Sequence, residues 1–297
     1  MRDTLVIERK IENKLPLAPG RLPELAVLAR RIRATCVQMA FDGKEGHLSS
    51  ALSCVDILVS LYHEWLRVDP TNINEPKRDR LLFSKGHAAS ALYSVLAERG
   101  FIDVQMLAQY AKPGRPLPNH PCKFMLPCLE ISSGSLGHGL GIGTGMAYSL
   151  KYRGLDSRVA VVMSDGECNE GSVWEASAFA CAHKLDNLLA IVDNNNMQAV
   201  GRTNLLLGET SFEEKFESFG WSARTIDGHD IGEIVATLKQ VPFARNKPSA
   251  IICKTRGGQG VSFMTDQTLW HYRIPSADDL SRALDELAAT PLYEVTR

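Results

Sequence analysis

Hydrophobic residues follow two periods along the chain, and each period predicts a different kind of element. Short, uniformly apolar runs predict buried strands at residues 81–83, 159–163, 188–192, 223–226 and 250–253. Apolar residues spaced three to four positions apart predict helices at residues 22–40, 55–66, 87–99, 137–152, 173–182, 212–219 and 231–241. Because strands and helices alternate, the pattern predicts a doubly wound α/β fold, with a mostly parallel sheet and helices on both faces.

The segments outside this alternation set the expected domain limits. Residues 1–20, with prolines and a glycine near their end, are expected to form an N-terminal arm. Residues 21–275 are expected to form one binding domain, and residues 276–297 a helical tail. The first helix is expected to end in a turn at residues 42–43. Residues 112–128 hold five prolines and no periodicity, which is typical of a functional loop in a compact domain.

The overall composition narrows the possible classes of function. The 297 residues carry a formal net charge of −1, which gives no electrostatic reason to expect nucleic acid or an anionic membrane as a partner. No apolar run is long enough to span a bilayer, and the first residues lack the pattern of a secretory signal. The seven cysteines are scattered without a CxxC pair, which favours free thiols in a reducing compartment. We therefore expect a cytoplasmic protein.

Polar residues follow two of the expected strands. Residues 164–167 read Ser-Asp-Gly-Glu, and residues 193–197 read Asp-Asn-Asn-Asn-Met. If these strands are parallel neighbours, the carboxylate of Asp165 and the amide oxygen of Asn195 come within reach of one ion. Oxygen ligands that include one carboxylate suit Mg²⁺. Either segment alone is more often a structural turn, but the two together at neighbouring strand ends favour a metal site.

An Asp-Gly pair followed about thirty residues later by Asn-Asn resembles the thiamine diphosphate motif, and the surrounding residues resemble the transketolase family. The resemblance implies the diphosphate-binding type of the thiamine diphosphate-binding fold. It implies that Mg²⁺, or Ca²⁺ or Mn²⁺ in its place, is held by Asp165, Asn195 and the backbone carbonyl of Met197. The cofactor contacts that it implies in this motif are Asp165, Gly166, Glu167 and Asn195, with Gly166 offering its N–H to the diphosphate.

Four histidines extend the resemblance. His47, His87, His120 and His271 lie in the segments Gly-His-Leu-Ser-Ser, Ser-Lys-Gly-His-Ala, Asn-His-Pro and Trp-His, in the order of the family. Any one of them alone is more often a turn or core residue. By resemblance, His47 and His120 contact the substrate and the reaction intermediate, and His87 lies by the cofactor diphosphate. His271 lies near both the diphosphate and the substrate. All four are expected to be catalytic, because imidazoles donate to sugar oxygens and move protons near neutral pH. Tyr272 stands where the family usually has glycine.

Further family positions lie in the glycine-rich part of the chain. Gly134 and Leu136 match a loop whose backbone meets the aminopyrimidine ring of the cofactor. Glu170 and Glu175 match glutamates between the two cofactors of a family dimer, although acids at a helix N-terminus are also favoured by the helix dipole. The glycines at 139–145 lack the G-x-G-x-x-G spacing and a preceding strand, which argues against a dinucleotide-binding oxidoreductase.

The resemblance covers only the diphosphate-binding half of a full-length transketolase. In that family the catalytic glutamate and the aromatic wall around the pyrimidine come from the following domain. The resemblance therefore implies a separately encoded partner subunit with the pyrimidine-binding domain and that glutamate, and self-association into two copies of each subunit. The expected reaction moves a two-carbon ketol group from a ketose donor to an aldose acceptor, with sugar phosphates as substrates.

Two other functions stay open at this point. The alpha subunits of thiamine-dependent 2-oxo-acid dehydrogenases share both the metal motif and a split architecture. Deoxyxylulose-phosphate synthases share the metal motif. The histidine segments favour transketolase over both. A non-catalytic transketolase-like scaffold subunit is the other alternative, and the presence of Asp165, Asn195 and the histidines argues against it.

Overall fold

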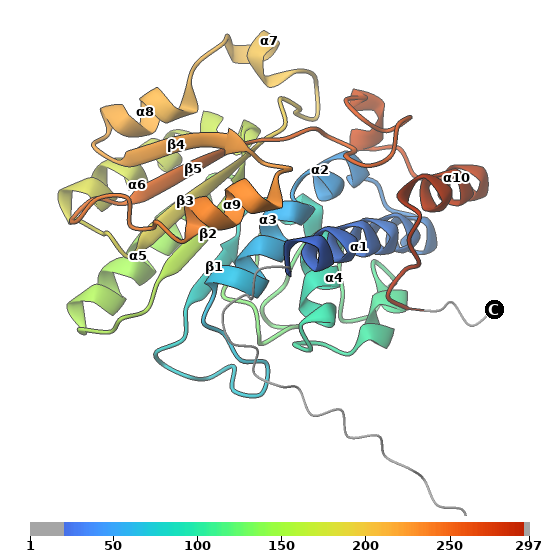
Figure 1. Ribbon diagram of the computed structural model, residues 1–297, viewed down its shortest axis with the longest axis horizontal. Coiled ribbons are helices and arrows are strands. Elements are labelled where there is room, and N and C mark those ends of the chain that lie inside the picture. Colours follow the sequence, from blue (N-terminus) through green and yellow to red (C-terminus); the bar gives the residue numbers. More distant parts are fainter. Residues whose placement is uncertain (1–20, 294–297) are drawn as a thin grey trace, which may run out of the picture.

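A parallel sheet forms the centre of the structure, a computed structural model that describes residues 21–293. Within these residues the sheet has five strands in the order β1-β2-β3-β5-β4 (Figure 1). The strands are β1 (Arg80–Phe83), β2 (Val159–Ser164), β3 (Leu188–Asn194), β4 (Ser222–Asp227) and β5 (Ser249–Lys254). The predicted neighbours β2 and β3 pair directly, so their carboxyl ends meet at one edge of the sheet.

Both faces of the sheet are buried under helices, which confirms the predicted fold class. Val159, Val161 and Met163 of β2 pack on one side, and Ala160 and Val162 pack on the other, as the two-residue period of a strand requires. The first side is covered by α5 (His138–Tyr152), α6 (Gly171–Ala182) and α8 (Phe212–Ser218). The second is covered by α1 (Arg21–Gly43), α2 (Leu48–Ser53), α3 (Val55–Ser60), α4 (Ala89–Glu98) and α9 (Ile231–Leu238).

The first third of the chain differs locally from the prediction. The turn expected at residues 42–43 lies later, because α1 continues through Gly43 and Lys44 takes a left-handed φ of 57°. The helix expected at 55–66 is α3 followed by a π-helical turn (Leu61–Trp65). Helix α2 was not predicted, since its six residues are too few to show a helical period. It begins directly after His47, and this places the histidine at a helix N-terminus.

The proline-rich segment 112–128 is a loop without a helix or strand, as predicted. Leu117 and Leu126 are buried in the core, and the hydroxyl of Tyr93 donates to the carbonyl of Pro118 at 3.0 Å. These contacts hold the loop against the body of the protein and place His120, two residues beyond Pro118.

The remaining parts of the chain lie around this core. Helix α10 (Ala277–Leu287) packs against α1, and short helix α7 (Thr203–Leu207) lies beyond the carboxyl ends of the strands (Figure 1). The expected arm at residues 1–20 and the last residues of the expected tail, 294–297, lie outside the described residues. All seven cysteines are free. Among the described helices, none has the length and apolar character that crossing a membrane requires.

Candidate functional site

Asp165 lies immediately beyond the end of β2, where Ser164 is paired with Asp193 of β3. Its side chain is fully buried. One carboxylate oxygen accepts from the N–H of Gly166 at 2.9 Å, and the other accepts from the hydroxyl of Thr203 at 2.8 Å. Both donors are neutral, and burial, with a smaller contribution from the charge of Asp193, raises the pKa of Asp165 to about 6. A buried carboxylate in such surroundings is suited to receive a cation.

Asn195 directly follows the last residue of β3, on the same edge of the sheet. Its Nδ2 donates to the hydroxyl of Ser53 at 3.2 Å, and Ser53 in turn donates to the carboxylate of Asp193 at 2.6 Å. Because the Ser53 proton is committed to Asp193, the group that faces Ser53 has to be the NH₂ of the amide. Ser53 therefore sets the orientation of Asn195 and turns its oxygen toward Met197, whose N–H donates to it at 3.0 Å.

A buried ion pair between Lys85 and Asp193 lies at this edge of the sheet. The ammonium of Lys85 contacts the carboxylate of Asp193, and it donates to the carbonyl of Ser50 at 3.0 Å. Burial alone would lower the pKa of Lys85, but the charge of Asp193 overrides it and the pKa is raised, so the lysine stays charged. Thr255 also donates to Asp193. Lys85 and Asp193 are not among the site residues that the sequence predicts; their signal in the sequence is a charged residue at the end of each of two buried strands.

The oxygen atoms at the two strand ends fit a small, hard cation. They comprise one carboxylate, from Asp165, one amide oxygen, from Asn195, and the adjoining carbonyls of the 193–197 segment, a set that matches the preferences of Mg²⁺. Within the described residues, no group of three or more His, Cys, Asp or Glu side chains is arranged to hold a metal. Met197 is held in place because its sulfur accepts from Ser49 at 3.3 Å, and a side chain on Gly257 would collide with it.

The structure brings the four predicted histidines into one cluster. The ring centroid of His47 lies 5.6 Å from that of His87, 6.1 Å from that of His120 and 5.3 Å from that of His271. The rings of His87 and His271 are 5.9 Å apart. His47 has a left-handed φ of 61°, and its N–H donates to the carbonyl of His271 at 2.8 Å. Four segments far apart in the sequence therefore converge beside the strand ends.

The cluster is neutral near pH 7, because the surroundings lower the pKa of every member. Burial, followed by the neighbouring His271 and His120, lowers the pKa of His47 to about 4. Burial and the charge of Lys85 lower the pKa of His87 and of His271. The pKa of His120 is lowered by burial. Neutral imidazoles can each accept one proton and donate another, which is the form that proton exchange with sugar hydroxyls needs.

The loop that carries Gly134 and Leu136 lies against this cluster. Gly134 has φ +143°, and a side chain there would approach the ring of His120 to 3.0 Å. A side chain on Gly86 would meet the backbone of Gly134 at 2.8 Å, so the two glycines allow the loop and the turn before His87 to touch. Leu136 is partly buried within the same loop. Their expected contact with a cofactor ring stays a prediction.

Glu167 connects the strand ends to that loop. One of its carboxylate oxygens accepts from the hydroxyl of Ser84 and from the N–H of Gly137, the latter at 2.9 Å. The other oxygen is buried and has no partner among the residues that the structure describes. Burial raises the pKa of Glu167. The carboxylate thus positions the loop, and its role toward a cofactor stays a prediction. Glu170 and Glu175 are exposed near the start of α6, so a place between two cofactors would require a second copy of the chain.

A cavity of about 620 Å³ opens beside the same strand ends. It is lined by amide and hydroxyl side chains, among them Asn194, Asn196 and Thr203, and by Lys254. None of the four clustered histidines lines it, so this cavity is separate from the cluster.

Comparison with known proteins places this arrangement in a family. The family model described as "Transketolase, thiamine diphosphate binding domain" matches residues 25–291. The chain is 35% identical over 264 residues to an apulose-4-phosphate transketolase subunit of Phocaeicola vulgatus, covering 89% of this chain and 94% of that protein. It is 37% identical over 226 residues to a 6-deoxy-6-sulfo-D-fructose transketolase subunit of a Clostridium species, covering 76% of this chain and 82% of that protein.

Full-length transketolases show which part of the longer protein this chain corresponds to. A solved transketolase from Campylobacter jejuni superposes with a TM-score of 0.81 at 31% identity, over 93% of this chain and 44% of that one. Human transketolase is 38% identical over 252 residues, which are 84% of this chain and 40% of that protein. The predicted kinship with one half of a split transketolase is confirmed, and these matches favour neither the dehydrogenase nor the scaffold alternative. The chain belongs to the transketolase family and corresponds to its thiamine diphosphate-binding domain.

Proposed function

We propose that this chain is the diphosphate-binding subunit of a two-subunit transketolase, which moves a two-carbon ketol unit from a ketose to an aldose. The observation that carries the proposal is the convergence of Asp165 and Asn195 at neighbouring strand ends, beside four neutral histidines. When bound, the cofactor supplies the electron sink that carbon–carbon cleavage next to a carbonyl requires.

The metal part of the site would use oxygen atoms already in place. Mg²⁺, or Ca²⁺ or Mn²⁺ in its place, would be held by Asp165, the oxygen of Asn195 and the carbonyl of Met197. The amide orientation that Ser53 imposes supports this assignment, because it presents oxygen and not nitrogen. Gly166, at the strand end, would offer its N–H to the cofactor diphosphate in place of the Asp165 carboxylate, to which it donates in this structure.

The histidines would act on the substrate. His47 and His120 are partly exposed, so they can contact the hydroxyl groups of a sugar. As neutral imidazoles they accept a proton from a hydroxyl when the carbon–carbon bond breaks and return it when the new bond forms. His87, whose Nε2 is 2.7 Å from the hydroxyl of Ser50, and the buried His271 are held more firmly and would orient the diphosphate.

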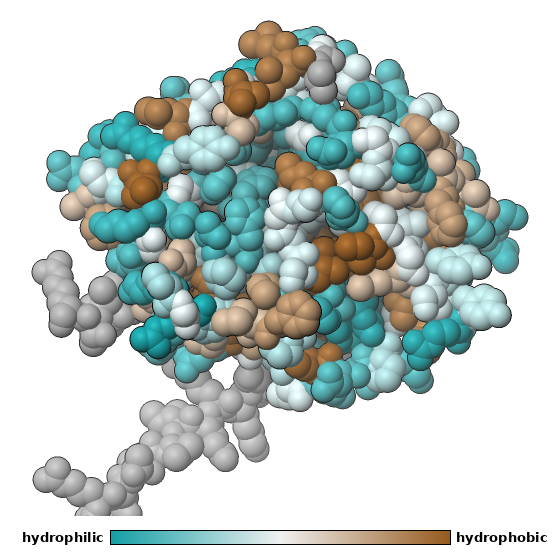
Figure 2. All heavy atoms as spheres, turned by 180° about the vertical axis from the view of Figure 1, so that it is seen from behind, coloured by the Kyte–Doolittle hydropathy of each residue, from teal (hydrophilic) through white to brown (hydrophobic). Residues whose placement is uncertain are grey.

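A partner subunit would complete the site, and the exposed groups around α7 support a place for it to dock. Helix α7 is tied to the 193–197 segment, because Asn196 accepts from the N–H of Thr203 at 3.3 Å and from the N–H of Asn204 at 2.9 Å. Next to these contacts Val200 and Leu205 are 82% and 79% exposed. Figure 2 shows hydrophobic residues at the top of the molecule, where α7 lies in Figure 1. Exposed apolar groups beside a site support a docking surface.

The proposed partner carries the pyrimidine-binding domain and a catalytic glutamate, and two copies of each subunit would assemble in the cytoplasm. Sugar phosphates are the proposed substrates. Two relatives of similar length are named as subunits of a transketolase, and these names support a separate partner.

Co-purification of the partner followed by an activity assay tests the proposal. The complex, with thiamine diphosphate and Mg²⁺, should transfer two carbons from hydroxypyruvate or a ketose phosphate to an aldose, and the chain alone should not. His120→Gln should abolish the transfer, whereas His183→Gln, a change at a histidine outside the cluster, should not. Acylation of a carrier from 2-oxo acids would support a dehydrogenase instead, and failure of the complex to bind thiamine diphosphate would support a scaffold.

A further inference from the structure

Tyr272 borders the histidine cluster on its solvent side. It directly follows the 3₁₀ turn Thr268–His271, and its ring centroid lies 5.4 Å from that of His47 and 4.8 Å from that of His271. Both ring pairs meet edge to face, at 70° and 74°. The side chain is nevertheless 61% exposed. One part of the ring therefore packs on two imidazoles of the cluster, and the rest faces solvent, where a substrate would approach the cluster.

The backbone fixes where this ring stands. A side chain on Gly46 would lie 2.7 Å from the carbonyl oxygen of Tyr272, so the two backbone segments touch. The hydrogen bond from His47 N–H to His271 holds the same two segments together. Tyr272 itself has φ −120° and ψ −14°, which any residue can adopt. The backbone would accept glycine or alanine equally well, so the tyrosine has to be explained by what its side chain contacts.

The charged groups around the ring are engaged elsewhere. The guanidinium of Arg273 stacks over Trp270, 4.9 Å from its centroid, and lies 3.6 Å from the carboxylate of Asp279. Lys85 is buried in its pair with Asp193. The Tyr272 ring and the imidazoles of His47 and His271 that it contacts thus form an uncharged aromatic surface. Such a surface suits the uncharged part of a hydroxylated chain, whose C–H groups pack on the ring while its hydroxyls meet the imidazoles.

We propose that Tyr272 is a specificity-determining residue, a wall against which the uncharged carbon chain of the substrate packs beyond the reacting carbons. Its ring occupies space that a longer or bulkier aldose would need, so it sets the preference among acceptors by chain length. The inference rests on the proposed transketolase function, and it adds the feature that selects among sugars.

The test compares acceptors in the complex with its co-purified partner, thiamine diphosphate and Mg²⁺, with hydroxypyruvate as the donor. Glycolaldehyde and ribose 5-phosphate serve as the short and the long acceptor. Tyr272→Ala should shift the ratio of their kcat/KM values by about tenfold toward the longer acceptor, because it frees the space that the ring occupies; this is the scale of discrimination typical of a small change in pocket size. The shift should arise mainly in KM. Tyr272→Phe should leave the ratio unchanged, because the ring is kept.

Two controls separate the possible outcomes. Tyr152→Ala removes a tyrosine that is 84% exposed at the end of α5, and it should leave the ratio unchanged. If Tyr272 only supported His47 and His271, the alanine variant would lower kcat for both acceptors alike and shift the pH profile, with an unchanged ratio; that result would overturn the inference. A wild-type complex that transfers two-carbon units to neither acceptor would instead refute the proposed function, and the inference with it.

Discussion

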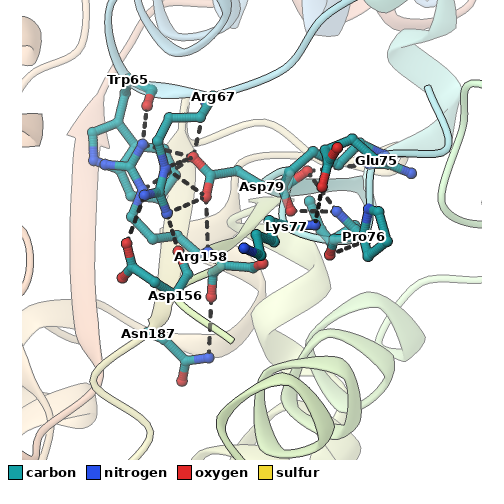
Figure 3. Close-up of polar contacts among 12 residues, drawn as sticks. Trp65, Arg67, Glu75, Pro76, Lys77, Asp79, Asp156, Arg158 and Asn187 are labelled. Atoms are coloured by element: carbon teal, nitrogen blue, oxygen red, sulfur yellow. Dashed lines mark hydrogen bonds and ion pairs between the residues drawn. The ribbon is translucent and has the colours of Figure 1, made fainter. Parts of the chain in front are cut away.

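Two buried aspartates stand at opposite ends of two neighbouring strands, β1 and β2, and their surroundings differ sharply. Asp79 immediately precedes β1 and accepts from two guanidiniums, Arg67 at 2.9 Å and Arg158 at 2.6 Å (Figure 3). Burial alone would raise its pKa, but these hydrogen bonds and charges hold the pKa of Asp79 below its usual value. Asp165 follows β2 and accepts hydrogen bonds only from neutral donors; burial, with a smaller contribution from the charge of Asp193, raises its pKa to about 6.

This difference in charged partners distinguishes a carboxylate that stabilises the fold from one that is available to bind a ligand. A carboxylate that serves the fold is compensated by cations of the chain itself, as at Asp79. A buried carboxylate without such compensation destabilises the folded state, and it persists where a ligand supplies the missing charge. We therefore interpret Asp79 as a structural residue at the amino ends of these strands, and we propose that Asp165, at the carboxyl ends, receives the metal.

Removing the uncompensated carboxylate should have the largest effect on binding. We expect Asp165→Ala to weaken Mg²⁺-dependent binding of thiamine diphosphate at least about 1000-fold, equivalent to about 4 kcal/mol. The same change should leave the free energy of unfolding of the metal-free chain unchanged or higher, since it removes a carboxylate whose charged form is disfavoured by burial. Calorimetric titration of the complex and urea unfolding in EDTA measure the two quantities. Unchanged cofactor affinity would refute the assignment.

Removing the carboxylate of Asp79, which is paired with two arginines, should lower stability and leave cofactor binding unchanged. Asp79→Ala leaves two guanidiniums without their shared partner, and we expect it to lower the free energy of unfolding by on the order of 3 kcal/mol. Cofactor affinity of the folded complex should stay the same. Urea unfolding measures the first effect. If the Asp79 variant were as stable as the wild type, the contrast between the two ends of the sheet would lose its basis.

A single hydroxyl should have an intermediate effect. Ser53→Ala removes the acceptor that orients Asn195, and loss of a group that orients a metal ligand typically weakens metal binding about 10- to 100-fold. Ser60→Ala is the matched control, because the Ser60 hydroxyl is equally buried and has no partner among the described residues. Titration with Mg²⁺ and cofactor should distinguish the two variants; equal affinities would show that Asn195 does not depend on Ser53.

The smallest expected effect is the change in stability with pH that the histidine cluster causes near neutral pH. The folded pKa of His47, about 4, lies below the value of about 6.5 in an unfolded chain, so the unfolded state binds the proton more tightly. Stability should therefore fall as the pH drops from about 6.5 to about 4, and His47 should stay neutral at pH 6. NMR titration of the imidazole protons checks this. A midpoint for His47 near 6.5 would contradict the geometry of the cluster.

Much of the fold could be predicted from the sequence, because β2 and β3 are uniformly apolar and a crossover helix separates them. The resemblance also led to the four histidines that the structure brings together. The order in which β5 lies between β3 and β4 was not predictable, because it depends on long-range pairing. The same holds for the Lys85–Asp193 pair, whose members are 108 residues apart. Short helices such as α2 and α7 could not be predicted, because five or six residues are too few to show a helical period.

The central claim is that the ends of β2 and β3 hold one metal ion together. Crystals of the complex grown with thiamine diphosphate and Mn²⁺ in place of Mg²⁺ test it directly, because the anomalous signal locates the ion. We expect one peak in contact with the carboxylate of Asp165, the amide oxygen of Asn195 and the carbonyl of Met197, at about 2.0–2.2 Å. A bound cofactor whose metal lies elsewhere, or contacts only one of the two strand ends, would contradict the claim.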